Sequence, residues 1–300
     1  MRVLPYHGLT YCTLLLCVPL FLIQGCSRAV LQTYPASAQE FALVTEAFTH
    51  YQAVITELCG CCLDAEIDVS LSVSGWFSDH TGNLTGYLQA MEPGFMKFIS
   101  VNPLGQPLFI FATNGNIFKS FDIFAQKAYA GSVHSNAYKK FAPPGFDPGF
   151  SYYWLTGRLQ PGNIRIMAVM RDREQDAFWL QIDHADSGMG SMVLFDPENK
   201  VILRHVLRDN RDAHLVDVIY KEHRTLPERE SGLTDRGPAA VPYSPAESDG
   251  CRVPARIMVS SKGGSEQVEI KLHSMLRDIH FSAVDFQIEA PDNFEQLLVE

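Results

Sequence analysis

The chain has 300 residues, of which 46 % are hydrophobic and 19 % charged, so it can bury a sizeable core and is not a disordered chain. Its 34 acidic residues against 24 Lys and Arg give a formal net charge of -10 at pH 7. This balance excludes nucleic acid as a partner, because nucleic-acid binders carry clustered Lys and Arg.

Residues 1–25 have the pattern of an export signal. The apolar run from Leu14 to Ile23 has the length of a signal core and is too short to span a bilayer. It ends in Ile-Gln-Gly-Cys, which resembles the bacterial lipobox, so we expect cleavage before Cys26 and acylation of that cysteine. Ser27 replaces the Asp typical of inner-membrane lipoproteins, which favours an anchor in the outer membrane on its periplasmic face. The alternative is an ordinary signal peptide followed by a chance cysteine.

The next segments predict one helix and then many strands. Apolar residues recur at three and four positions from Ala36 to Leu58, which predicts an amphipathic helix. Apolar and polar residues alternate strictly over 63–74, which predicts a strand with one wet face. A short helix is predicted over 150–159, and a solvated, flexible loop over 224–250. The other expected strands cover 82–91, 94–102, 106–113, 116–122, 126–133, 164–171, 177–184, 190–197, 200–208, 213–222, 252–261, 266–273 and 284–290.

Short turns between these strands predict antiparallel neighbours, and a sheet of this size must curl or close. We therefore expect a mainly β fold with flanking helices. The chain divides into a signal peptide over 1–25, a lipidated tether over 26–35 and one domain over 36–300.

Four cysteines remain after the leader and the lipid site: Cys59, Cys61, Cys62 and Cys251. In an exported chain they are expected to form disulfides, with one member of the cluster over 59–62 paired to Cys251 and the other two paired or free. A four-thiolate zinc site and free thiols are the alternatives.

No motif for catalysis, phosphate binding or metal binding is present in the sequence. His184 with Asp183 and Asp186 is the best metal-like cluster, and it is more simply explained as a solvated strand end. We therefore expect no enzyme activity, no metal and no cofactor.

Two short motifs carry a resemblance to a known family. Asn102-Pro103-Leu104-Gly105 forms a turn between two expected strands, and Trp154-Leu155-Thr156-Gly157 follows in the second expected helix. In register with the leading helix and the first strand, this layout resembles the LolA/LolB family of lipoprotein carriers and receptors, and the LolB type in particular.

The resemblance implies an unclosed antiparallel half-barrel whose concave face is covered by α-helices and encloses an apolar cavity. It implies an outer-membrane lipoprotein that binds acyl chains of lipids or lipoproteins, helps to insert them and receives them from a periplasmic lipoprotein carrier. By position, Leu104 corresponds to an exposed tip for membrane or acyl insertion. The length, the cysteine cluster and the 224–250 loop depart from LolB-type members.

Strand parity predicts which side chains point into this cavity. The expected lining positions are Val69, Leu71, Val73, Leu88, Ile99, Ile166, Ala168, Leu180 and Ile182, with Trp154 from the covering segment. The same positions would suit a filled core. The alternative function is therefore a non-catalytic interaction or assembly subunit of the envelope.

Overall fold

The computed structural model describes residues 32–74, 79–138, 141, 148–186, 188–208, 214–226, 250–261, 266–276 and 279–300. The signal peptide, Cys26 and most of the 224–250 loop lie outside these residues. Within them, no helix is both long and apolar enough to cross a membrane.

Helix α2 (Ala38–Cys59) begins at a strong local start signal, a capping box. The Ser37 hydroxyl accepts a hydrogen bond from the Glu40 amide, and the Glu40 carboxylate accepts one from the Ser37 amide. Its buried residues, spaced by three and four, form the stripe that packs on the sheet: Val44, Phe48, Tyr51, Ile55 and Cys59.

The strands form one continuous sheet with the order β1-β8-β9-β10-β11-β12-β13-β14-β2-β3-β4-β5-β6-β7-β15. All neighbours are antiparallel except β15 and β7, and β1 and β15 at the two ends do not pair with each other. The first half of the sheet comprises β1 (Thr33–Pro35), β2 (Cys62–Ser74), β3 (Asp79–Met91), β4 (Phe95–Val101), β5 (Pro107–Asn114), β6 (Ile117–Asp122) and β7 (Lys127–Ser132). The second half comprises β8 (Ile164–Asp172), β9 (Phe178–His184), β10 (Met189–Asp196), β11 (Val201–Arg208), β12 (His214–Thr225), β13 (Arg252–Ser261), β14 (Glu266–Leu276) and β15 (Glu295–Val299).

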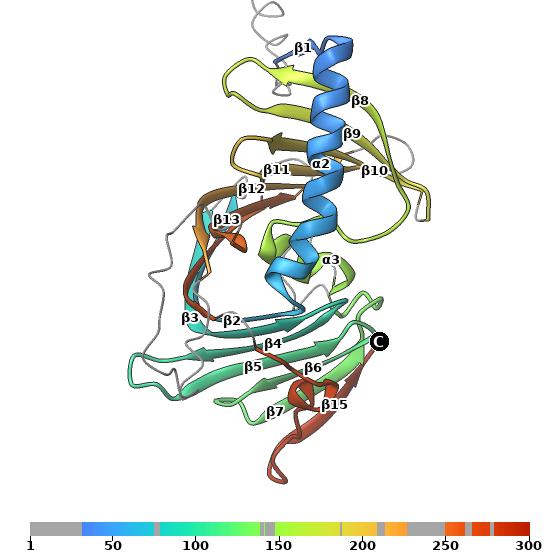
Figure 1. The fold of residues 1–300 in the computed structure, drawn as a ribbon. Coiled ribbons are helices and arrows are strands. Elements are labelled where there is room, and N and C mark those ends of the chain that lie inside the picture. Colours follow the sequence, from blue (N-terminus) through green and yellow to red (C-terminus); the bar gives the residue numbers. More distant parts are fainter. Residues whose placement is uncertain are drawn as a thin grey trace, which may run out of the picture.

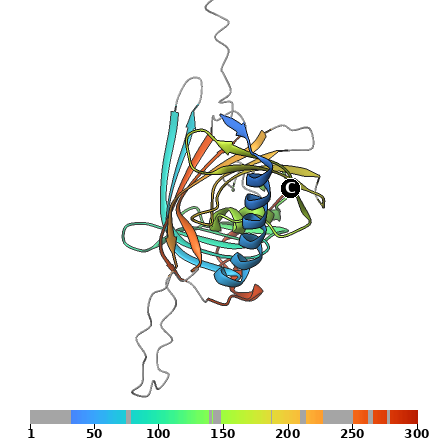
Figure 2. The same cartoon turned by 45° about the horizontal axis from the view of Figure 1, so that its top comes forward.

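The sheet curves into an unclosed half-barrel, and both helices lie on its concave side (Figures 1 and 2). Helix α2 crosses β8 to β11, where the Phe48 ring meets the Phe195 ring edge-on at 5.1 Å. Helix α3 (Pro148–Thr156) lies deeper, between β13 and β4. The predicted fold class, an open antiparallel half-barrel with helices on its concave face, is confirmed.

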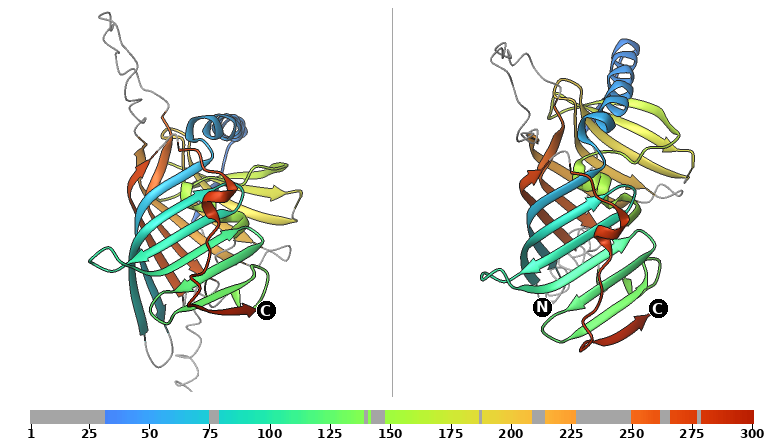
Figure 3. Two further views of the ribbon diagram at one scale, coloured as in Figure 1. Left: turned by 90° about the horizontal axis from the view of Figure 1, so that it is seen from below. Right: turned by 60° about the horizontal axis from the view of Figure 1, so that its bottom comes forward.

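The C-terminal segment differs from the sequence prediction. Residues 284–290 do not form a strand; a 3₁₀ turn, η2 (Ala283–Phe286), is followed by an extended stretch and then by β15. This segment crosses the convex face of the sheet (Figure 3), where Ile288 and Phe294 pack against Phe121. The alternating apolar residues that predicted a strand serve instead to cover this outer face.

The N-terminal tether also differs in part. Residues 33–35 form the edge strand β1 beside β8, within the segment 26–35 that was predicted to be a tether. Such a short strand gives little periodic signal.

Candidate functional site

An apolar cavity of about 130 Å³ lies between the concave face of the sheet and its covering segments. All its lining side chains are apolar: Ile67, Val69, Leu84, Leu88, Met96, Phe98, Phe109, Phe111, Phe141, Leu155 and Ile270. They come from β2 to β5, from β14 and from the segment that contains α3. Leu84 is 44 % exposed, so this end of the cavity reaches the surface.

Strand pairing explains why these residues meet. Leu88 on β3 is directly opposite Phe98 on β4, which is opposite Phe111 on β5, and directly opposed residues share a face. Gly86 leaves room for the Phe98 ring, because a Cβ there would lie 2.9 Å from Phe98 Cε2 and would clash with the Ile99 carbonyl oxygen. The aromatic wall of the cavity therefore depends on a glycine in the neighbouring strand.

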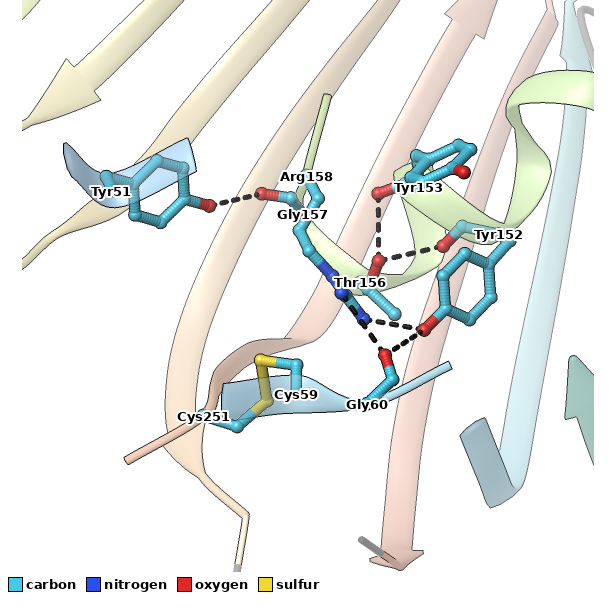
Figure 4. The surroundings of a disulfide bond; sticks show 9 residues. All are labelled: Tyr51, Cys59, Gly60, Tyr152, Tyr153, Thr156, Gly157, Arg158 and Cys251. Carbon is cyan, nitrogen blue, oxygen red and sulfur yellow. Dashed lines mark hydrogen bonds between the residues drawn. A yellow bond between two sulfur atoms is a disulfide. The ribbon is translucent and has the colours of Figure 1, made fainter. Parts of the chain in front are cut away.

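Helix α3 covers the cavity with Leu155 and is tied to the end of α2 (Figure 4). Arg158 Nη2 donates to the Tyr152 hydroxyl at 2.7 Å, and that hydroxyl donates to the Gly60 carbonyl at 3.1 Å. Arg158 Nη1 lies 3.5 Å from the same carbonyl oxygen, and the Tyr51 hydroxyl donates to the Gly157 carbonyl at 3.2 Å. Burial raises the pKa values of Tyr51 and Tyr152, so both hydroxyls stay protonated as donors.

Arg158 is only 4 % exposed, and no carboxylate in the described part of the chain forms an ion pair with it. Its Nε atom has no hydrogen-bond partner there. Burying a guanidinium with so few partners is costly. The side-chain hydrogen bonds that Arg158 forms lie between the end of α3 and Gly60.

The cysteine cluster lies at this junction. Cys59 at the end of α2 is bonded to Cys251 before β13, with the two Cα atoms 4.8 Å apart, and Cys61 is bonded to Cys62. Gly60 lies between the two disulfides with φ of 64°, a left-handed conformation that favours glycine. Both disulfides therefore border the residue that receives the bonds from α3.

Only two of the predicted lining residues, Val69 and Leu88, line the cavity. A further group packs in the same concave core without reaching it: Leu71, Trp154, Ile166, Leu180 and Ile182. The side chain of Val73 lies outside the described residues.

Ile99 and Ala168 are on the convex face, so their inward assignment is corrected. Ile99 is opposite Tyr87 and Ile110 on the convex face, whereas its neighbour Phe98 points to the concave face. Ala168 is opposite the exposed Gln181, because a bulge between Ile166 and Ala168 shifts the parity of β8.

The aromatic lining residues on β4 and β5 were missed. Apolar residues such as Ile99 and Ile110 alternate with Phe98 and Phe111, so both faces of these strands are apolar. The C-terminal segment covers the outer face beside Ile110, and this removes the alternation that would have identified the inner face. The one available signal was Gly86, which marks a close approach within a strand.

The turn at Leu104 is fixed and its side chain points outward. The Asn102 Oδ1 atom accepts hydrogen bonds from the amides of Leu104 at 2.9 Å and Gln106 at 3.0 Å. Leu104 is 83 % exposed. Two more apolar side chains are exposed at this corner of the sheet, Leu108 at 43 % and Phe124 at 95 %, where the Ile123 amide bonds the Leu108 carbonyl at 3.1 Å. We call Leu104, Leu108 and Phe124 the apolar corner.

The metal-like cluster at His184 does not converge. Asp183 pairs with Arg165 at 2.9 Å, Asp186 accepts from the Asn163 amide, and His184 Nε2 bonds the Ser191 hydroxyl at 2.8 Å. Across the described ranges, no three His, Cys, Asp or Glu side chains are placed to hold a metal ion.

No protein-family model and no curated protein matches the sequence. Among solved structures, the chain is similar to a DUF1329 family protein from Desulfovibrio piger, with TM-score 0.50, 9 % identity and coverage of 81 % of this chain and 97 % of that one. A LolA superfamily protein from Nitrosomonas europaea aligns with TM-score 0.49 and 9 % identity over 80 % of this chain and 97 % of its own. At this identity, the likeness to the first structure establishes a shared fold. The LolA superfamily is thus among the matches, and nothing in them distinguishes the LolB type.

Proposed function

We propose that this protein binds acyl chains of lipids or lipoproteins beneath α3, and that it acts by binding and release without catalysis. One observation carries the proposal: an opening on the concave face leads to a cavity lined by apolar side chains only. Apolar burial contributes about 25 cal/mol per Å², so an acyl chain would gain several kcal/mol without any polar contact. Such a site would discriminate little between head groups.

The cavity requires movement of its cover. Its volume of about 130 Å³ is well below the roughly 300–1,000 Å³ of ordinary ligand sites. A complete acyl chain would therefore displace Leu155 or Phe141, the two lining residues that do not belong to the sheet. Ligand uptake is expected to shift α3 between a closed and an open position.

We further propose that the protein is a lipoprotein of the bacterial outer membrane, anchored through acylated Cys26 on the periplasmic side. The apolar corner supports contact with lipid, because the two hairpin tips 102–106 and 123–126 contain no charged residue. A periplasmic lipoprotein carrier is the proposed donor of the acyl chains.

The second candidate is an interaction or assembly subunit of the envelope that uses the same fold with a filled core. The small cavity volume favours it, because the side chains already occupy most of the space beneath α3.

A matched pair of substitutions on β3 separates the two candidates. Leu84 lines the cavity and Tyr87 lies on the opposite face, with similar exposures of 44 % and 48 %. We expect the delipidated protein to take up a fluorescent fatty acid, Leu84→Glu to weaken this binding by about tenfold or more, and Tyr87→Glu to change it by less than about twofold, because a carboxylate in the cavity must be desolvated. Absence of uptake by the parent protein would favour the filled-core subunit.

A further inference from the structure

Three cysteines within four residues differ sharply in their access to solvent. Cys59 is 4 % exposed and its partner Cys251 is fully buried, so their disulfide is shielded from reagents in solution. Cys61 is partly exposed, whereas its partner Cys62 is 5 % exposed. Because exchange needs a thiolate to approach a sulfur atom, Cys61 is the accessible sulfur of the cluster.

A buried cation also lies at this junction. Breaking a disulfide releases a thiolate, and a nearby cation stabilises a thiolate. The buried guanidinium of Arg158 reaches the Gly60 carbonyl, one residue before Cys61, and lacks a carboxylate partner in the described part of the chain (Figure 4). The Glu92 carboxylate accepts a hydrogen bond from the Tyr153 hydroxyl at 3.3 Å and lies at the same junction, so it partly offsets this positive charge.

We propose that the Cys61–Cys62 bond is a site of thiol–disulfide exchange with a dithiol reductant, and that its redox state sets how firmly α3 is held over the cavity. A thiolate of the dithiol attacks Cys61 Sγ, the Cys61–Cys62 bond breaks, and Cys62 leaves as a thiolate that takes up a proton. The second thiol of the reagent then displaces Cys61 from the mixed disulfide. The protein gains two electrons and two protons, and the dithiol becomes a disulfide.

The link to α3 passes through the backbone of Gly60. Its carbonyl accepts the Tyr152 hydroxyl and lies within 3.5 Å of Arg158, and Cys61 itself is held by a hydrogen bond of 3.1 Å from the Glu92 amide to its carbonyl. Opening the ring between Cys61 and Cys62 gives this short segment more freedom. The hydrogen bonds that hold the end of α3 then lose their fixed acceptor. An effect of the Cys61–Cys62 redox state on ligand uptake rests on the proposed function, whereas the two measurements below are independent of that function.

The first measurement maps which sulfurs react. The full chain, purified oxidised in detergent, is treated with limiting dithiothreitol, blocked with light N-ethylmaleimide, then unfolded, fully reduced and labelled with the heavy reagent. Cleavage after glutamate yields residues 58–66, with three cysteines, and residues 248–266, with Cys251. We expect light label at Cys61 and Cys62, while Cys59 and Cys251 carry the heavy label as an internal control. Equal reduction of both bonds, earlier reduction of Cys59–Cys251, or free Cys61 and Cys62 before any reductant is added would overturn the exchange site.

The second measurement follows α3 by amide hydrogen exchange. We expect backbone amides of residues 148–158 to exchange several-fold faster after selective reduction, while those of α2 over 41–55 stay unchanged. The double variant Cys61→Ser with Cys62→Ser keeps Cys59–Cys251 and should show the faster exchange without any reductant. Unchanged exchange of residues 148–158 in both samples would overturn the link between the disulfide and α3, whatever the labelling shows.

Discussion

His205 is a buried histidine within a polar group on the concave face of the sheet. Its Nε2 atom lies 2.8 Å from the Ser191 hydroxyl, which also bonds His184 Nε2, and its Nδ1 atom has no partner among the described residues. Burial, together with the nearby His184, lowers the pKa of His205 to about 3. A neutral His205 that donates from Nε2 leaves only a lone pair unpaired at Nδ1, which costs less than an unpaired N–H.

This pKa makes the protein less stable in acid. As pH falls below the ordinary value of 6.5, the unfolded chain protonates at His205 while the folded chain does so only near pH 3, so the free energy of unfolding falls across that window. His205→Gln removes this titration and keeps a donor for Ser191. Between about pH 7 and pH 5 we expect the variant to lose about 1–2 kcal/mol less stability than the parent in urea unfolding. Parallel pH profiles for the two proteins would contradict a neutral buried His205.

Among the elements, the C-terminal segment has the least expected role. It covers the convex face over β5 to β7 through Ile288 and Phe294, and Lys119 Nζ donates to the Ile288 carbonyl at 3.0 Å. It then adds β15 in parallel to the edge strand β7. An otherwise exposed sheet edge and an apolar outer face are covered by one stretch of chain.

Ile288→Ala should therefore destabilise the protein by about 2–4 kcal/mol, because Ile288 is 9 % exposed and its removal leaves a cavity over Phe121. Leu298 on β15 is 90 % exposed and provides the control. Leu298→Ala should change the free energy of urea unfolding by less than about 0.5 kcal/mol. Equal losses in the two variants would mean that the segment contributes through its backbone pairing alone.

The helices and strands also show which structural features sequence patterns can predict. The strands β2 to β14 and both helices follow from the periodicity of apolar residues and from the turn residues at their ends, whereas β1 was not predicted. The inward face of β4 could not be predicted, since the segment that covers its outer side comes about 190 residues later. The bulge in β8 shifted Ala168 outward without any sequence mark. One lining residue was therefore predicted on β2, Val69, and one on β3, Leu88, and the lining residues on β4 and β5 were missed.

At the scale of the whole molecule, the apolar corner and the cavity suggest one orientation toward lipid. Leu84 at the open end of the cavity lies on β3, beside the β4 strand whose turn carries Leu104. In the proposed function, an acyl chain would pass between the cavity and the membrane along this edge. Because the protein has a net charge of -10, anionic lipid head groups do not attract it, and apolar contact is the expected attraction to lipid.

Substituting both hairpin tips tests this orientation. Leu104→Glu combined with Phe124→Glu should keep fatty-acid uptake and reduce acyl transfer to liposomes by about tenfold or more, because two carboxylates must then approach the apolar lipid region. Ile117→Glu is the control, since Ile117 is 53 % exposed at the opposite end of β6. Undiminished transfer by the double variant would place the membrane contact elsewhere.

The strand order also constrains how the chain folds after export. β2 pairs with β3 on one side and with β14 on the other, and β14 begins about 190 residues after β2 ends. A chain that emerges from its N-terminus therefore exposes one edge of β2 until nearly all of the sequence has arrived. Cys251 also follows Cys59 by 192 residues, and until it is exported Cys59 can form non-native disulfides with the nearer Cys61 and Cys62. Because β2 pairs with the distant strand β14, we expect the protein to fold slowly and to depend on a disulfide isomerase.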